Sequence, residues 1–215
     1  MAKLQIILGS TRPTRNAERV VPWVTKRAEA HGDFDVEVLD LRDWRLPLFQ
    51  EHRASIGDFS DPTYSEPIVR KWNRKLKEGE AFLFVTPEYN HSIPSVLKNA
   101  FDNVFVSWAL RNKPGAFVGY STGLGGGIRA IEHLALIAIE AELVPLRNTV
   151  VIPKVEAAFT EAGNPVDPIA DKSLGVLLDD LAWWSKVLAK ARAEGELPPA
   201  AFRRPPAPKP DLEET

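Results

Sequence analysis

A polar stretch near the N-terminus combines the groups that bind a phosphate. Residues 9–16 read Gly-Ser-Thr-Arg-Pro-Thr-Arg-Asn and lie between an apolar segment and a helical one. They offer hydroxyl groups, two guanidinium groups and the unpaired N–H groups of a helix start. This combination favours an anion site suited to a phosphate monoester. Taken alone, such a stretch is more often a polar helix cap beside solvated arginines.

A second stretch, residues 87–102, has the composition of a surface that grips a flat ring. It begins Pro-Glu-Tyr-Asn-His-Ser and enters a helix through Pro94, a residue tolerated at helix starts. An aromatic, an amide and a carboxylate meet there in a rigid turn. We expect backbone groups to do most of the binding, and His91 to be a loop histidine and not a catalyst.

A third stretch, residues 120–129, reads Tyr-Ser-Thr-Gly-Leu-Gly-Gly-Gly-Ile-Arg. Glycines let the backbone approach a ligand and adopt positive φ. A glycine cluster by itself indicates only a flexible turn, but three suitable loops in this order are stronger evidence than any one of them.

The elements that position these loops follow from the apolar periodicity. Strands are expected over residues 4–8, 34–40, 81–86, 114–121 and 143–152, the last interrupted by Pro145. Helices are expected over residues 17–30, 67–77, 95–106, 126–142 and 168–193. Residues 41–66 show no regular pattern, and a loop of that length is usually functional or part of an interface.

Strands alternating with helices predict a parallel sheet with right-handed crossovers. The G-x-G-x-x-G and G-x-x-x-x-G-K-[ST] motifs are both absent from the sequence, which argues against the corresponding nucleotide-binding folds. We therefore expect an α/β, flavodoxin-like, doubly wound sheet of five parallel strands in the order 2-1-3-4-5, with helices on both faces. The loops after strands one, three and four then share one edge and one ligand.

The bulk composition narrows the function classes. The chain has 215 residues, no cysteine, four histidines and a formal net charge of -2. The charge favours neither nucleic acid nor a membrane surface, and the cysteine count excludes thiol chemistry and thiolate metal sites. We expect no metal, a cytoplasmic location, one domain over residues 1–194, and a Pro-rich disordered tail over residues 195–215.

The three loops resemble those of the NADPH-dependent FMN reductase family. The resemblance rests on Gly-Ser-Thr-Arg at 9–12, Pro-Glu-Tyr-Asn at 87–90 with Leu-Lys-Asn-Ala-Phe-Asp at 97–102, and Gly-Gly-Gly at 125–127 followed by Arg129-Ala130. It covers roughly positions 4 to 155. It implies a flavodoxin-like protein with non-covalent FMN that oxidises NADPH or NADH and passes electrons to a flavin, quinone, azo compound or oxidised metal.

The resemblance also implies the residues of the site. The FMN phosphate would contact Ser10, Arg12, Arg15 and Asn16. The isoalloxazine would lie along Pro87, Glu88, Tyr89, Asn90 and Ser92, and the far side would be closed by Ser121, Gly123, Gly125 and Gly126. No side chain is expected as catalyst, since the flavin performs the chemistry. Backbone N–H groups of Tyr89, Asn90 and the glycine loop would stabilise charge on the reduced ring.

Two other functions fit the same fold: an FMN-containing electron carrier, and a flavin-free regulatory module. The low net charge and the long segment 41–66 favour the reductase. The family's members usually form homodimers or homotetramers, and six aromatics are candidates for interface or core: Trp44, Trp72, Phe105, Trp108, Trp183 and Trp184. A preference for NADPH over NADH would need an arginine near the dinucleotide, for which Arg45, Arg53 and Arg111 are candidates.

Overall fold

A parallel sheet forms the centre of the protein. The computed structural model describes residues 1–52, 54–58, 62–104 and 106–204. The strands run in the order β2-β1-β3-β4-β5, and a sixth strand, β6, also pairs with β4. Their bounds are β1 Ala2–Leu8, β2 Phe34–Asp40, β3 Ala81–Pro87, β4 Pro114–Tyr120, β5 Val144–Pro145 and β6 Val150–Ile152. The predicted flavodoxin-like fold and strand order are confirmed.

The expected fifth strand is present as two short pieces. Val144 and Pro145 pair with the start of β4, and Val150 to Ile152 pair with its end. Pro145 has no N–H to donate to a ladder, and the chain rejoins β4 five residues later. Both pieces are parallel to β4, so the sheet has six strands where five are expected.

The helices differ from expectation mainly at their ends. They are α1 Ala17–His31, α2 Leu41–Trp44, α3 Pro67–Glu78, α4 Ser95–Asp102, α5 Ile128–Glu140, the 3-10 helix η1 Val155–Ala157, α6 Pro168–Gly195 and α7 Ala200–Arg203. The short α2 lies in a region expected to be irregular. α4 ends at Asp102, not at residue 106. α5 begins at Ile128, not at residue 126, because Gly126 and Gly127 have φ angles of 61° and 89°.

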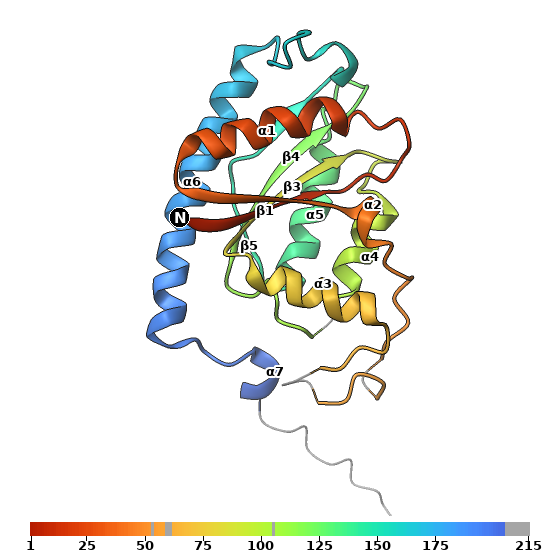
Figure 1. Ribbon diagram of the computed structural model, residues 1–215, viewed down its shortest axis with the longest axis vertical. Helices are drawn as coiled ribbons and strands as arrows, with labels where there is room; N and C mark the ends of the chain where they lie inside the picture. Colours follow the sequence, from red (N-terminus) through yellow and green to blue (C-terminus); the bar gives the residue numbers. More distant parts are fainter. Residues whose placement is uncertain (53, 59–61, 105, 205–215) are drawn as a thin grey trace, which may run out of the picture.

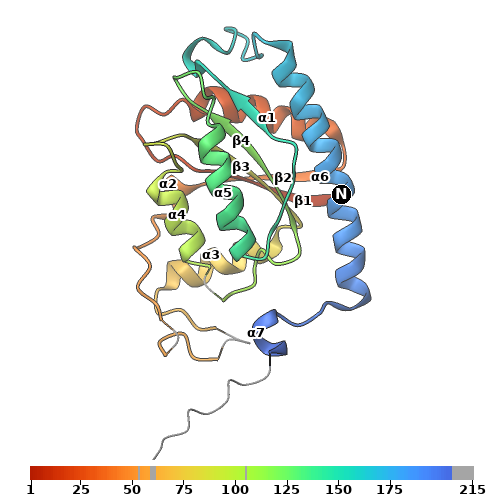
Figure 2. The ribbon, with the colours of Figure 1, turned by 180° about the vertical axis from the view of Figure 1, so that it is seen from behind.

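Alternating strand residues build two separate cores. Ile6 and Leu8 pack with α1 and α6, whereas Ile7 between them packs with α3, α4 and α5. Figures 1 and 2 show the two faces, with α1 on one and α4 and α5 on the other. Because β1, β3 and β4 lie between these layers, they are apolar along most of their length, as buried parallel strands are.

The aromatic candidates divide between core and surface. Trp44 and Trp72 are buried, with ring centroids 4.9 Å apart, and the Trp72 indole donates to the Ala100 carbonyl at 3.0 Å. Trp183 and Trp184 are exposed on α6. Trp108 lies 6.2 Å from the Phe202 ring, and Phe105 lies outside the described residues.

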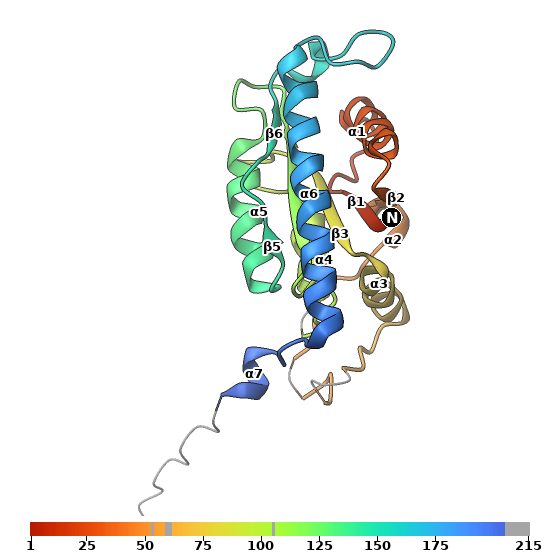
Figure 3. The ribbon, with the colours of Figure 1, turned by 90° about the vertical axis from the view of Figure 1, so that its left-hand side faces the viewer.

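Helix α6 runs along the sheet, and α7 lies beyond its C-terminal end (Figure 3). The segment between them is attached to the domain, because Glu196 pairs with Arg111 at 2.9 Å. Residues 196–204 therefore have contacts that a fully disordered tail would lack, whereas residues 205–215 lie outside the described residues. Within the described part of the chain, no helix combines the length and apolarity needed to cross a bilayer.

One close contact of the backbone fixes where α5 begins. A Cβ added at Gly127 would lie 2.5 Å from the Tyr120 nitrogen, and one added at Gly119 would lie 2.9 Å from the Gly127 carbonyl oxygen. The chain after β4 therefore folds directly back on the end of its own strand, which only glycines permit.

We expect Gly127→Ala to lower the free energy of unfolding by about 3 kcal/mol, since the new Cβ meets immobile backbone at a positive φ. Gly163→Ala is the matched control, because Gly163 also has a positive φ but nothing within 4 Å of the added carbon. It should cost only about 1 kcal/mol. Urea unfolding measures both, and equal losses would contradict the packing argument.

Candidate functional site

The loops after β1, β3 and β4 meet at the carboxyl edge of the sheet, where ligands bind in open α/β folds. They enclose a cavity of about 270 Å³. Its walls are Arg12, Thr14, Arg15 and Asn16 from the first loop, residues 87–90 from the second and residues 120–122 from the third, with Val155 from η1. Figures 1 and 2 show the loops after β1 and β3 side by side at this edge.

Arg15 holds the first loop in shape. Its side chain is only 3% exposed. The guanidinium donates to the Ser10 carbonyl at 2.6 Å, to both carboxylate oxygens of Asp40, at 2.7 Å for Oδ1, and to Glu18 at 2.9 Å. The group expected to hold a phosphate is thus fully engaged by protein acceptors, and it joins the loop to the end of β2.

The Asp40 carboxylate is charged because of this pairing. Burial raises its pKa, but hydrogen bonds from Arg15 and from the Arg42 N–H outweigh burial and hold the pKa of Asp40 below its usual value. The pair therefore stabilises the fold at neutral pH, and this contribution falls as the pH drops toward the lowered pKa.

Arg12, in contrast, faces the cavity side of the loop. It is exposed, and its guanidinium carbon lies 3.8 Å from the centroid of the Tyr89 ring, a cation–π contact. The Tyr89 hydroxyl is 2.7 Å from the Ser10 Oγ, which is fully buried. These contacts join the first loop to the second.

Several backbone N–H groups of the first loop are left without acceptors. Those of Thr11, Arg12 and Thr14 donate to no group among the residues that the structure describes. Asn16 caps α1 without a side-chain hydrogen bond. Free N–H groups at the start of a helix form a site for an anion.

The second loop is a tight turn closed by two backbone hydrogen bonds. The Tyr89 N–H donates to the Ser92 carbonyl at 2.8 Å, and the Ser92 N–H donates back at 3.0 Å. Asn90 and His91 between them have φ angles of 49° and 70°, which these residue types tolerate better than most. The Tyr89 N–H, expected to face a ligand, is therefore used by the turn, whereas the Asn90 N–H, also expected there, has no acceptor among the described residues.

Side chains brace this turn against α5. The Glu88 side chain is 6% exposed and pairs with Arg129, whose Nη1 lies 3.2 Å from the His91 Nδ1. Because arginine only donates, His91 accepts at Nδ1 and carries its proton on Nε2. On the other side, the His133 Nδ1 lies 2.9 Å from the Ser92 Oγ.

The third loop is held by the segment that follows β6. The Ser121 N–H donates to the Ile152 carbonyl at 3.1 Å, and the Ser121 Oγ to the Gly123 carbonyl at 3.2 Å. Gly126 is buried against Val151 and Pro153. It allows close packing and does not line the cavity.

Eight of the expected site residues line the cavity: Arg12, Arg15, Asn16, Pro87, Glu88, Tyr89, Asn90 and Ser121. The other five, Ser10, Ser92, Gly123, Gly125 and Gly126, lie in the same loops but outside its wall. The sequence analysis missed Thr14, Tyr120, Thr122 and Val155. The first three are adjacent in sequence to residues that were predicted, so the sequence could have indicated them. Val155 is apolar and lies in a distant segment, so its residue type gives no indication of a binding site.

Tyr120 is a notable member of the wall. It is 3% exposed, and its hydroxyl has no hydrogen-bond partner in the described part of the chain. Burial raises the pKa of this phenol, so Tyr120 stays neutral and its hydroxyl can donate a hydrogen bond in the cavity.

A comparison of the sequence with known families matches residues 2–157 to the NADPH-dependent FMN reductases. An NAD(P)H-dependent FMN reductase of Schizosaccharomyces pombe is 31% identical over 154 residues, which cover 71% of this chain and 74% of that protein. A 2-hydroxy-1,4-benzoquinone reductase of a Burkholderia species is 28% identical over 186 residues, covering 85% of this chain and 95% of that protein.

Among solved structures, the flavoenzyme FerB of Paracoccus denitrificans, an NAD(P)H:(acceptor) oxidoreductase, superposes with a TM-score of 0.69. It has 24% identity and covers 86% of this chain and 98% of that one. The chain thus shares that fold and belongs to the NADPH-dependent FMN reductase family. It is an FMN-dependent oxidoreductase that uses NAD(P)H.

We expect Asp40→Asn to lower the free energy of unfolding at pH 7 by about 2 kcal/mol, because it leaves the buried Arg15 charge partly uncompensated. The loss should begin to shrink below about pH 4, the usual pKa of aspartate, and should disappear once the pH falls below the lowered pKa of Asp40. Urea unfolding at several pH values measures it.

Asp102→Asn is the control, because the Asp102–Lys98 pair is exposed on α4 and should contribute only about 0.4 kcal/mol. A loss for Asp40→Asn that is as small, or that does not depend on pH, would contradict the role of the pair.

Proposed function

We propose that the cavity at the carboxyl edge holds FMN without a covalent bond, with the phosphate on the first loop and the ring along the second and third. The observation that carries this proposal is the set of unpartnered N–H groups of Thr11, Arg12 and Thr14 at the start of α1. They fit a phosphate and are costly to leave unpaired without a ligand or water.

The two arginines of the first loop then have different roles. Arg12 supplies the exposed positive charge beside the phosphate, and Asn16 and Ser10 complete that end of the site. Arg15, engaged by Asp40, Glu18 and the Ser10 carbonyl, is a positioning residue that keeps the N–H groups aimed outward.

In the part of the cavity proposed to hold the isoalloxazine ring, backbone groups offer polar contacts and side chains form the walls. The N–H groups of Asn90 and Thr122 have no acceptor among the described residues and are available to the polar edge of the ring. Pro87 and Tyr89 offer flat apolar surface, and Glu88 braces the turn through Arg129. The buried ends of these loops keep water away from one face.

FMN held by these three loops would supply the redox chemistry, the transfer of a hydride from NAD(P)H and of electrons to an acceptor. The residues of this chain orient both reactants, and none of the cavity side chains is placed to act as an acid or base. We propose that the oxidised nucleotide leaves before a small-molecule acceptor takes the same place, which predicts ping-pong kinetics. Among flavins, quinones, azo compounds and oxidised metals, the benzoquinone reductase among its relatives favours a quinone.

We expect Arg12→Ala to weaken FMN binding about tenfold or more, because it removes a charged partner of the phosphate. Fluorescence titration of the apoprotein measures the dissociation constant. Arg19→Ala is the control: Arg19 is exposed on α1 and lies outside the cavity. Equal FMN binding by both variants would refute the phosphate assignment, and a protein that takes up no FMN would refute the proposed function.

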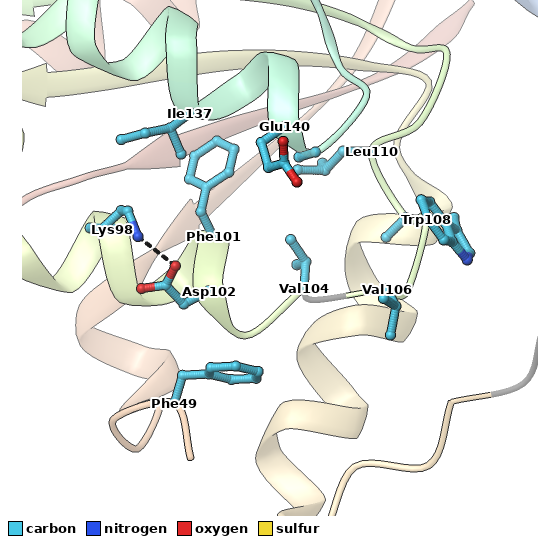
Figure 4. Close-up of a pocket in the computed structure, with 12 residues that line it drawn as sticks. Phe49, Lys98, Phe101, Asp102, Val104, Val106, Trp108, Leu110, Ile137 and Glu140 are labelled. Carbon is cyan, nitrogen blue, oxygen red and sulfur yellow. Dashed lines mark hydrogen bonds and ion pairs between the residues drawn. The ribbon is translucent and has the colours of Figure 1, made fainter. Parts of the chain in front are cut away.

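We also propose that the protein forms a homodimer, or a homotetramer built from such dimers. An apolar groove of about 280 Å³ lies between α4 and α5. Figure 4 shows Phe49, Phe101 and Ile137 around it, with the Lys98–Asp102 pair at its edge. Leu136 and Ile139 on α5 are 69% and 56% exposed. An apolar helix face beside an apolar groove supports a two-fold contact with a second copy.

We expect Ile139→Glu to dissociate the assembly, because it buries a charge in an apolar contact. Sedimentation velocity over a range of protein concentrations measures the oligomeric state. Ile169→Glu, at the start of α6 and 65% exposed, is the matched control and should leave the assembly intact. A wild-type monomer at all concentrations would refute the proposed contact.

The remaining assignments concern location and domain limits. We propose a cytoplasmic enzyme, since its reductant NAD(P)H is supplied there and the chain contains no cysteine. We propose that residues 1–194 are the catalytic domain. The following tail, residues 195–215, contributes nothing to the cavity through the residues described.

A further inference from the structure

We propose that a second cavity beside the FMN site binds a phosphate monoester carried by a co-substrate, and that Arg45 recognises it. The proposal rests on the proposed function, because it assigns a specificity residue to the same reaction. Recognition of this phosphate would let the enzyme discriminate NADPH from NADH as reductant, or FMN from riboflavin as acceptor.

The second cavity has a volume of about 430 Å³, within the range of small-molecule sites. It lies between the first loop, α2 and the start of α4, and Thr11, Arg42, Arg45 and Asn99 are among its lining residues. Thr11 is in the first loop, and the residue after it, Arg12, lines the proposed FMN cavity. The two cavities therefore adjoin across one loop.

The charge of this cavity is positive and uncompensated. Its charged lining residues are the two arginines, and no acid lines it. Arg42 is engaged, because its guanidinium contacts Glu18 at 3.2 Å and the Pro13 carbonyl at 3.0 Å. The guanidinium of Arg45, by contrast, has no ion pair or hydrogen bond to any residue described in the structure. An unpaired arginine in such a cavity fits an anionic ligand.

The backbone holds Arg45 in one place. It ends α2 in the left-handed region, with φ 38° and ψ 46°, where glycine or asparagine is usual. Before it, the Asp40 carboxylate caps α2 by accepting the Arg42 N–H at 3.0 Å. After it, the Asn99 amide donates to the Pro47 carbonyl at 2.9 Å and accepts the Phe49 N–H at 3.0 Å. An arginine kept in this conformation by both flanks is consistent with a functional position.

The other candidate arginine that the structure describes, Arg111, does not fit. Arg111 is buried and pairs with Glu142 and Glu196. It precedes β4, at the edge of the sheet opposite to the cavity. Arg53 lies outside the described residues. Of the two candidates that the structure describes, Arg45 has an available guanidinium beside the proposed reaction site and Arg111 does not.

Two co-substrates carry the required phosphate monoester: NADPH at its adenosine 2′ position, and free FMN when it is the electron acceptor. The experiment separates them. Binding of adenosine 2′,5′-bisphosphate and of adenosine 5′-monophosphate to the FMN-loaded protein is measured by calorimetry. The KM values for FMN and for riboflavin as acceptors are measured in parallel.

The variants are Arg45→Gln, Arg45→Lys and the control Arg74→Gln. Arg74 is exposed on α3, so its variant makes the same charge change away from the cavity. If the nucleotide is the source, Arg45→Gln should weaken bisphosphate binding about tenfold and monophosphate binding little. If the recognised phosphate belongs to the acceptor, Arg45→Gln should raise the KM for FMN but not for riboflavin. Arg45→Lys should restore part of either loss.

The proposal is overturned if Arg45→Gln changes neither pair of values, or if Arg74→Gln changes them as much. The FMN content of each variant is measured first. Preparations of the unaltered protein that hold no FMN would contradict the proposed function, whereas full FMN content with unchanged phosphate discrimination would contradict only the role of Arg45.

Discussion

The buried guanidinium of Arg15 is the interaction on which the site depends. A charge in that position is tolerated only with full compensation, and Asp40, Glu18 and the Ser10 carbonyl provide it. Because Asp40 ends β2 and Ser10 follows β1, this arrangement ties two neighbouring strand ends to one loop. The N–H groups of Thr11, Arg12 and Thr14 are left without an acceptor among the residues that the structure describes.

This constraint divides the work between backbone and side chains. Backbone N–H groups without an acceptor among the described residues lie in the first loop and at Asn90 and Thr122. Side chains hold those backbones in place: Arg15 for the first loop, Glu88 and Arg129 for the turn, and Asn99 for the segment after Arg45. A flavin enzyme needs such rigid orientation, because the cofactor already supplies the reactivity.

Much of this could be predicted from the sequence. The alternation of apolar and polar residues predicts β2 to the residue, and the continuous apolar runs predict β1 and β3. The order of the polar loops indicates one shared edge. Partners distant in sequence were not visible: Arg15 resembles a phosphate ligand until Asp40, 25 residues later, engages it. The Tyr89 N–H is withdrawn by turn geometry that residue types alone do not specify, and Val155 reaches the cavity only because β6 pairs with β4.

A crystal structure of the protein with FMN added tests the central claim most directly. The account predicts the phosphate within hydrogen-bond distance of the N–H groups of Thr11, Arg12 and Thr14, Arg15 still paired with Asp40, and the ring between the Asn90 turn and residues 121–123. A three-loop cavity that stays empty, or an FMN there whose phosphate lies away from these N–H groups, would contradict it.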